Sequence, residues 1–156
     1  MQPDPNDPVY ESSLPYEKSR IHAAGIYCSD GRIGEHFDDF LQNGLNLPRH
    51  DRIALPGGPV CLAGHPQAHL EQQGLVNELN FLVKVHGLKR LVLIAHQGCA
   101  FYTANLQLDE RRLELVQRAD LVRAAAFVDQ VTGIESIDAY FMRLVDGRFR
   151  FERVEV

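Results

Sequence analysis

The sequence lacks tryptophan and has only three cysteines among its 156 residues, Cys28, Cys61 and Cys99. An odd number of cysteines at wide spacings argues against a disulfide framework and favours a cytoplasmic protein that uses cysteine for metal binding or catalysis. There is no basic run, and the net charge is −5, so nucleic acid is not an expected partner. No apolar stretch approaches a membrane span, and the polar, proline-rich start is not a secretory signal. We therefore expect a cytoplasmic location without membrane contact.

The composition that remains is that of one ordinary domain. Hydrophobic residues make up 45% of the chain and charged residues 24%, so the chain is long enough to bury a core. Residues 1–20 are rich in proline and show little apolar periodicity. We predict an N-terminal arm over residues 1–20, flexible alone or lying on a partner subunit, and a single α/β domain over residues 21–156.

Apolar periodicity and turn residues divide the domain into alternating strands and helices. Strands are expected over residues 21–28, 52–55 and 89–96, and helices over residues 33–45, 66–86 and 107–131. Asp146-Gly147, between two alternating runs, predicts a closing β-hairpin. This order predicts a three-layer α-β-α fold with a mainly parallel central sheet, strand order 2-1-3-4, and a C-terminal antiparallel hairpin strand.

The stretches CSDGR and HQGC hold candidate metal ligands at two predicted strand ends. Cys28 ends the first strand and His96 ends the third, with Cys99 three residues further on. Ligands of open α/β sheets bind outside the carboxyl ends of the strands, so adjacent first and third strands would bring these side chains together. Two thiolates and one imidazole suit zinc and leave a fourth position open, where a bound water ionises near pH 7. We predict one Zn²⁺ per chain.

Asp30 and Arg32 follow Cys28 at alternate positions, which face the same way on an extended backbone. Arg32 could hold the Asp30 carboxylate bidentately and orient it towards zinc-bound water. If that pair breaks, Asp30 could instead become a fourth zinc ligand and close the site. The sequence leaves both resting states open.

CSDGR followed by HQGC resembles the paired C-x-D-x-R and H-x-x-C signatures of β-class carbonic anhydrases. The stretches LVNELNFLVKVHGLKRLVLIAHQGCA and YFMRLVDGRFRF are similar to that family's ligand segment and terminal hairpin. The resemblance implies that Cys28, His96 and Cys99 bind zinc and that Asp30 and Arg32 form a catalytic dyad. It implies reversible hydration of carbon dioxide to bicarbonate by zinc-bound hydroxide, and a homodimer or dimer of dimers.

The sequence departs from the family at the expected wall of the substrate pocket. Where members carry an Arg-Asn-Ala-Gly-Asn-like stretch, this chain reads RIALPGGPV, in which Gly57 and Gly58 are candidates for binding substrate through backbone amides. A zinc hydrolase of carbon disulfide or carbonyl sulfide, or a non-catalytic zinc protein of the same fold, would keep the metal ligands. A thiol-redox enzyme is a third alternative, although the chain has no C-x-x-C pair. Cys61 is expected to be structural, and His65 and His69 to lie on a helix surface.

Overall fold

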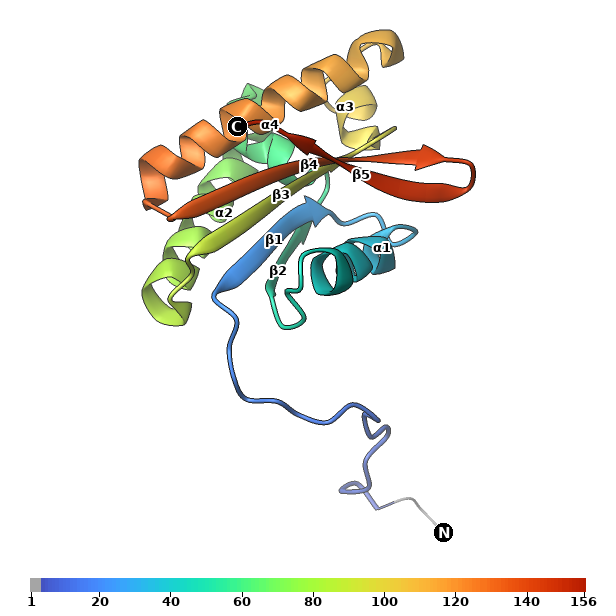
Figure 1. Ribbon diagram of the computed structural model, residues 1–156, viewed down its shortest axis with the longest axis vertical. Helices are drawn as coiled ribbons and strands as arrows, with labels where there is room; N and C mark the ends of the chain where they lie inside the picture. The colour runs from blue at the N-terminus through green and yellow to red at the C-terminus, as the bar shows by residue number, and fades with distance from the viewer. Residues whose placement is uncertain (1–3) are drawn as a thin grey trace.

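The central sheet has five strands in the order β2-β1-β3-β4-β5, with helices on both faces (Figure 1). The computed structural model describes residues 4–156. Pairing is parallel throughout, except that β4 and β5 run antiparallel. The predicted fold class, strand order and hairpin are therefore confirmed. The strands are β1 (Ala23–Cys28), β2 (Asp51–Leu55), β3 (Arg90–His96), β4 (Ser136–Val145) and β5 (Arg148–Val154).

The helices are shorter than predicted, because several of their ends are 3₁₀ or π turns. They are α1 (Gly34–Asp39), α2 (His69–Phe81), α3 (Ala100–Ala104) and α4 (Leu113–Thr132). The π turns over residues 40–44 and 82–86 extend α1 and α2. A 3₁₀ turn precedes α2 at Pro66, where the fixed proline φ and missing N–H suit the start of a helix.

The prediction that a helix begins at residue 107 is wrong. A 3₁₀ turn over residues 110–112 leads into α4. Asp109 caps this 3₁₀ turn by accepting a 3.0 Å hydrogen bond from the Arg111 N–H. The five residues of α3 lie in a segment predicted to be a loop.

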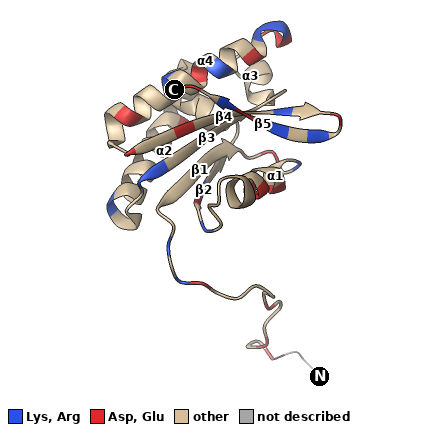
Figure 2. Ribbon diagram, in the orientation of Figure 1, with Lys and Arg blue, Asp and Glu red and all other residues tan. Residues whose placement is uncertain are grey.

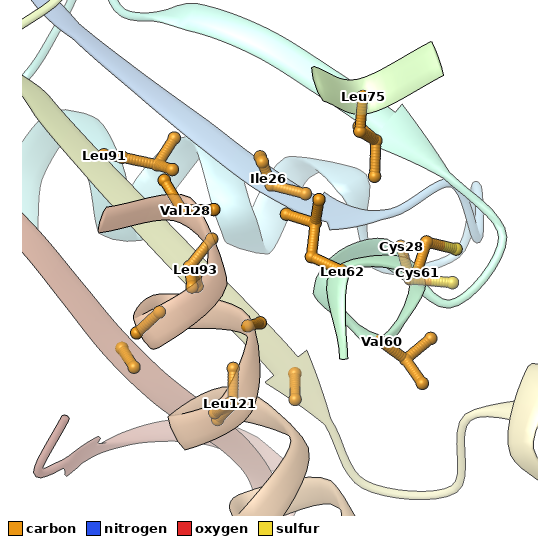
Figure 3. Packing of buried hydrophobic residues seen from close by; sticks show 14 of the residues in the cluster. Ile26, Cys28, Val60, Cys61, Leu62, Leu75, Leu91, Leu93, Leu121 and Val128 are labelled. Carbon is orange, nitrogen blue, oxygen red and sulfur yellow. The ribbon is translucent and has the colours of Figure 1, made fainter. Parts of the chain in front are cut away.

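Two hydrophobic clusters hold the layers together, one on each face of the sheet. Leu75 and Leu79 of α2 and Leu121 of α4 pack in the larger cluster with Leu91 and Leu93 of β3. Figure 3 shows Val128 of α4 next to Leu91 and Leu93, and Leu75 of α2 on the side of Ile26 and Leu62. The second cluster joins α1 to the opposite face through side chains that include Phe37 and Ile94. Because both faces are covered, β3 is buried from Leu91 to His96, as its unbroken apolar run predicts.

The parallel pairing of β1 with both β2 and β3 brings three strand ends to one edge of the sheet. β1 carries no charged residue, and it lies between neighbours that do (Figure 2). Residues 4–20 of the described chain form no helix or strand and extend away from the sheet (Figure 1). Over residues 4–156, no helix combines the length and the apolarity that crossing a bilayer requires.

Candidate metal centre

Three potential metal ligands meet where β1 and β3 end. The Sγ atoms of Cys28 and Cys99 and a ring nitrogen of His96 all lie within 4.8 Å of one another. Tetrahedral zinc, with Zn–S bonds of about 2.3 Å and Zn–N bonds of about 2.0 Å, requires ligand atoms roughly 3.5–3.8 Å apart. The three atoms therefore lie close to the separation that one tetrahedral ion needs, although 68 residues separate Cys28 from His96.

The His96 ring is oriented as a metal ligand would be. Its Nδ1 lies 2.9 Å from the Gln97 carbonyl oxygen, and a carbonyl accepts only, so Nδ1 carries the proton. Nε2 is buried without a hydrogen-bond partner among residues 4–156. A buried polar atom without a partner is costly, and a cation at this point would supply the missing partner.

The two thiols are buried, and their proximity shifts their pKa values in opposite directions. The pKa of Cys28 is lowered, chiefly by its contact with the Cys99 thiol, with the backbone amides of Gly57 and Asp30 acting in the same direction and burial opposing them. The same contact, together with burial, raises the pKa of Cys99. All three cysteines of the chain are free thiols. Two cysteine thiols and one imidazole form a donor set that fits zinc.

Two glycines allow the backbone to present these ligands. Gly98, between His96 and Cys99, has a φ of 70°, so the tight H-x-x-C turn uses the left-handed conformation that glycine permits. Gly58 has a φ of 54°, and a Cβ atom there would lie 2.6 Å from the Tyr27 carbonyl carbon and 2.8 Å from the Cys28 nitrogen. The loop after β2 therefore passes directly against the strand end that carries Cys28.

Asp30 and Arg32 form a bidentate ion pair. Arg32 Nη2 lies 2.7 Å from Asp30 Oδ2, and Arg32 Nε lies 3.0 Å from Oδ1. The backbone N–H of Arg32 donates to the same carboxylate at 3.0 Å. These bonds lower the pKa of Asp30 to about 2. In this structure Asp30 pairs with Arg32 and does not belong to the ligand group.

The ion pair borders a cleft of about 390 Å³ that reaches the ligand loop. Its wall combines Asp30, Arg32 and His96 with the apolar side chains of Ile33, Leu144 and Phe149. The β4–β5 hairpin, which contributes Leu144 and Phe149, is tied to the ligand loop because the Leu144 N–H donates to Gln97 Oε1 at 3.1 Å. The cleft is large enough for a small molecule, and its wall is partly apolar.

Other candidate residues lie outside this cleft. Gly57 and Gly58 are buried, and the amide of Gly57 contributes to lowering the pKa of the Cys28 thiol. Neither glycine lines the cleft. Substrate binding by these two residues stays a prediction. The Cys61 thiol is buried and donates to the Pro56 carbonyl at 3.5 Å, as a structural residue would.

His65 is half-buried rather than a plain surface histidine, since it contacts the buried carboxylate of Asp120 at 2.8 Å. His69 is exposed. Sequence reasoning missed Asp120 and Gln117, two buried polar residues of α4. Their signal was available, because both interrupt the apolar stripe of a predicted helix.

Comparisons with known proteins identify the family of this chain. A family model described as "Putative carbonic anhydrase" matches residues 18–145; no curated protein matches the sequence. The β-carbonic anhydrase isoform I of Trichomonas vaginalis is 12% identical, with a TM-score of 0.58 over 90% of this chain and 87% of that one. The carbonic anhydrase of Streptococcus mutans is 15% identical, with a TM-score of 0.56 over 86% and 81%. These structures share the fold, and the family match spans most of the sequence, so the chain belongs to this carbonic anhydrase family.

Proposed function

We propose that this chain binds one zinc ion through Cys28, His96 and Cys99 and catalyses the reversible hydration of carbon dioxide to bicarbonate. The observation that carries the proposal is the approach of the three ligand atoms to within 4.8 Å of one another, beside a carboxylate that an arginine holds. When bound, zinc supplies Lewis-acid activation of water.

In this proposal the Asp30–Arg32 pair orients the reacting water. The low pKa of Asp30 keeps its carboxylate ionised across the physiological range, so it can accept a hydrogen bond but does not itself donate a proton. Arg32 occupies both carboxylate oxygens, which holds Asp30 away from the ligand group. Ile33, Leu144 and Phe149 give the cleft an apolar wall that suits an uncharged substrate such as carbon dioxide.

Metal content tests the ligand assignment, and Cys61 provides a matched control. We expect about one zinc per purified chain by mass spectrometry, and almost none in the Cys28→Ala, His96→Ala and Cys99→Ala variants. Cys61→Ala removes a thiol that is equally buried but lies outside the ligand group, so that variant should keep its zinc. Retention of zinc by Cys28→Ala would refute the assignment.

Stopped-flow hydration of carbon dioxide tests the reaction. We expect zinc-dependent turnover that chelation abolishes and added zinc restores. Zinc-loaded protein that hydrolyses carbon disulfide or carbonyl sulfide, but does not hydrate carbon dioxide, would identify the altered-substrate alternative. Zinc without either activity would leave a non-catalytic zinc protein of this fold.

We also propose a homodimer or dimer of dimers in the cytoplasm. Val9, Tyr10, Leu14 and Tyr16 on the N-terminal arm are almost fully exposed, and a second subunit would bury them. Thiol ligands require reducing conditions to remain available to a metal, which supports the cytoplasmic location.

A further inference from the structure

α4 carries two polar side chains on its otherwise apolar inner face. Leu113, Leu121 and Val128 are among the buried residues of this helix, and Leu121 and Val128 point into the core in Figure 3. Gln117 and Asp120 are also buried, each with only 1% of its surface exposed. Burying an amide and a carboxylate is unfavourable unless both are hydrogen-bonded, so their partners indicate why they are there.

Gln117 binds the backbone of one proposed ligand. Its Nε2 donates a 2.7 Å hydrogen bond to the carbonyl oxygen of His96. His96 is the last residue of β3, and its ring is turned by the contact of Nδ1 with the Gln97 carbonyl. Gln117 therefore fixes the backbone from which the His96 ring projects.

Asp120 holds the other end of the ligand loop through Tyr102. The Tyr102 hydroxyl donates to Asp120 Oδ2 at 2.9 Å, and the Tyr102 side chain is almost completely buried. The backbone N–H of Tyr102 donates a 3.2 Å hydrogen bond to the carbonyl oxygen of Cys99. The link from Asp120 through Tyr102 therefore fixes the backbone from which the Cys99 thiol projects.

Asp120 is itself fixed by two further contacts. His65 Nε2 lies 2.8 Å from Oδ2, and Arg123 Nη1 donates to Oδ1 at 2.8 Å. Both carboxylate oxygens are thus occupied, which compensates for the burial of the carboxylate. Since Gln117 and Asp120 are three residues apart, they lie on one face of α4, and they reach the two halves of one loop.

We propose that Gln117 and Asp120 are positioning residues that hold the segment from His96 to Tyr102 in its metal-binding geometry. The inference rests on the proposed zinc site. A loop already fixed in the bound conformation loses less entropy when it takes up the metal, so the affinity is higher. Partners that orient metal ligands typically contribute 10- to 100-fold in metal affinity.

Zinc affinity, measured by competition with a chelator, tests the proposal. We expect Gln117→Met and Tyr102→Phe each to weaken zinc binding by about 10-fold or more. In the cobalt-substituted protein, the thiolate-to-metal charge-transfer band should shift in both variants, because the sulfur or imidazole geometry changes. Asp120→Ala should weaken zinc binding as much as Tyr102→Phe does. The double variant should bind zinc only slightly more weakly than either single variant, since both substitutions remove the same hydrogen bond between Tyr102 and Asp120.

Two controls separate positioning from general stability. Val128→Ala creates a cavity on the same helix, and Tyr140→Phe removes a hydroxyl from a buried ring in the other cluster. Val128→Ala should lower the melting temperature while leaving zinc affinity and the cobalt spectrum unchanged. Tyr140→Phe should leave both the zinc affinity and the cobalt spectrum unchanged. If Gln117→Met and Tyr102→Phe bind zinc like the native protein, the inference is wrong although the zinc site stands. If the native protein takes up no zinc, the proposed function itself fails.

Discussion

At the residue scale, the Asp30–Arg32 pair keeps a carboxylate ionised next to the proposed metal ligands. The Arg32 side chain lowers the pKa of Asp30 to about 2, yet 87% of the Arg32 side chain is exposed and 21% of the Asp30 side chain. A pair this exposed contributes little to the free energy of unfolding, because solvent screens it. The pair instead orients the Asp30 carboxylate. The effect of this orientation on turnover can be measured separately from the free energy of unfolding.

Replacing Arg32 with alanine should therefore preserve the fold and the zinc but remove most of the activity. We expect turnover of carbon dioxide to fall by about 100-fold, with unchanged zinc content by mass spectrometry. Arg32→Lys should recover little, because lysine lacks the planar fork that binds both oxygens. Arg153→Ala, which removes an exposed ion pair with Asp138 on the hairpin, is the matched control. Full turnover in Arg32→Ala would remove the pair from the mechanism.

Gly58 should be intolerant of even a methyl group. Gly58→Ala brings Cβ within 2.6 Å of the Tyr27 backbone and forces alanine to a φ of 54°. We expect a loss of about 3 kcal/mol or more in the free energy of unfolding, from backbone strain and overpacking together. Gly64→Ala has a similarly unfavourable φ of 91° but no neighbour within 4 Å, so it should cost only about 1 kcal/mol. Equal losses in urea titrations of the two variants would contradict the close approach.

At the element scale, four charged side chains join α4 to the β4–β5 hairpin. Arg143 of β4 donates to Glu114 of α4 and to Glu152 of β5, while Arg118 of α4 donates to the same two carboxylates. Both guanidinium groups lie over the Phe141 ring, at 4.8 Å for Arg118 and 5.4 Å for Arg143. This network fixes the hairpin, which also supplies an apolar wall to the cleft.

The network should give stability that depends on pH. Arg143 is the main cause of the lowered pKa values of Glu114 and Glu152, whose ordinary value is 4.5. A lowered carboxyl pKa stabilises the folded protein above that ordinary value, and the stabilisation is lost as pH falls through the folded-state pKa. Arg143→Ala should therefore lower the melting temperature at pH 7 more than at pH 3.

Calorimetry of both proteins across this pH range measures the difference. Arg148→Ala, which removes an exposed arginine of the same hairpin, should leave the melting temperature nearly unchanged at both pH values. A deficit in Arg143→Ala that stays constant from pH 7 to pH 3 would show that packing on Phe141, rather than charge, is what Arg143 contributes.

At the scale of the whole molecule, the arm has apolar side chains without a surface to cover them. Val9 and Tyr16 are more than 90% exposed, and the arm extends away from the domain in Figure 1. Near its end, Arg49 holds the chain by donating to the Ser19 carbonyl at 3.0 Å. The arm is thus anchored at its junction with the domain and is available to a second copy beyond it.

Removing residues 1–17 should weaken self-association while leaving the domain folded. We expect the full chain to sediment as a dimer or larger assembly, and the shortened chain to dissociate at a protein concentration at least about tenfold higher. Leu14→Ser together with Tyr16→Ser should have the same effect with the arm intact, because the apolar contacts are what it contributes. An unchanged assembly in both variants would show that the arm does not form the interface.

The sequence alone determined the order of the five strands and of α1, α2 and α4, and it identified the proposed metal ligands. Apolar runs, turn dipeptides and the two short motifs act over a few residues, so they can be interpreted without a fold. The sequence did not predict α3, because this helix of five residues is too short to show an apolar period. It is held by the burial of Phe101 and Tyr102 rather than by helix propensity.

Only the tertiary structure decided what these residues contact. The approach of Cys28 to His96 and Cys99 joins the ends of two strands. The bonds from Gln117 and Asp120 join α4 to the ligand loop. Such contacts leave no local period in the sequence. They arise because packing brings strand ends and one face of α4 together, after which each buried polar group must find a partner.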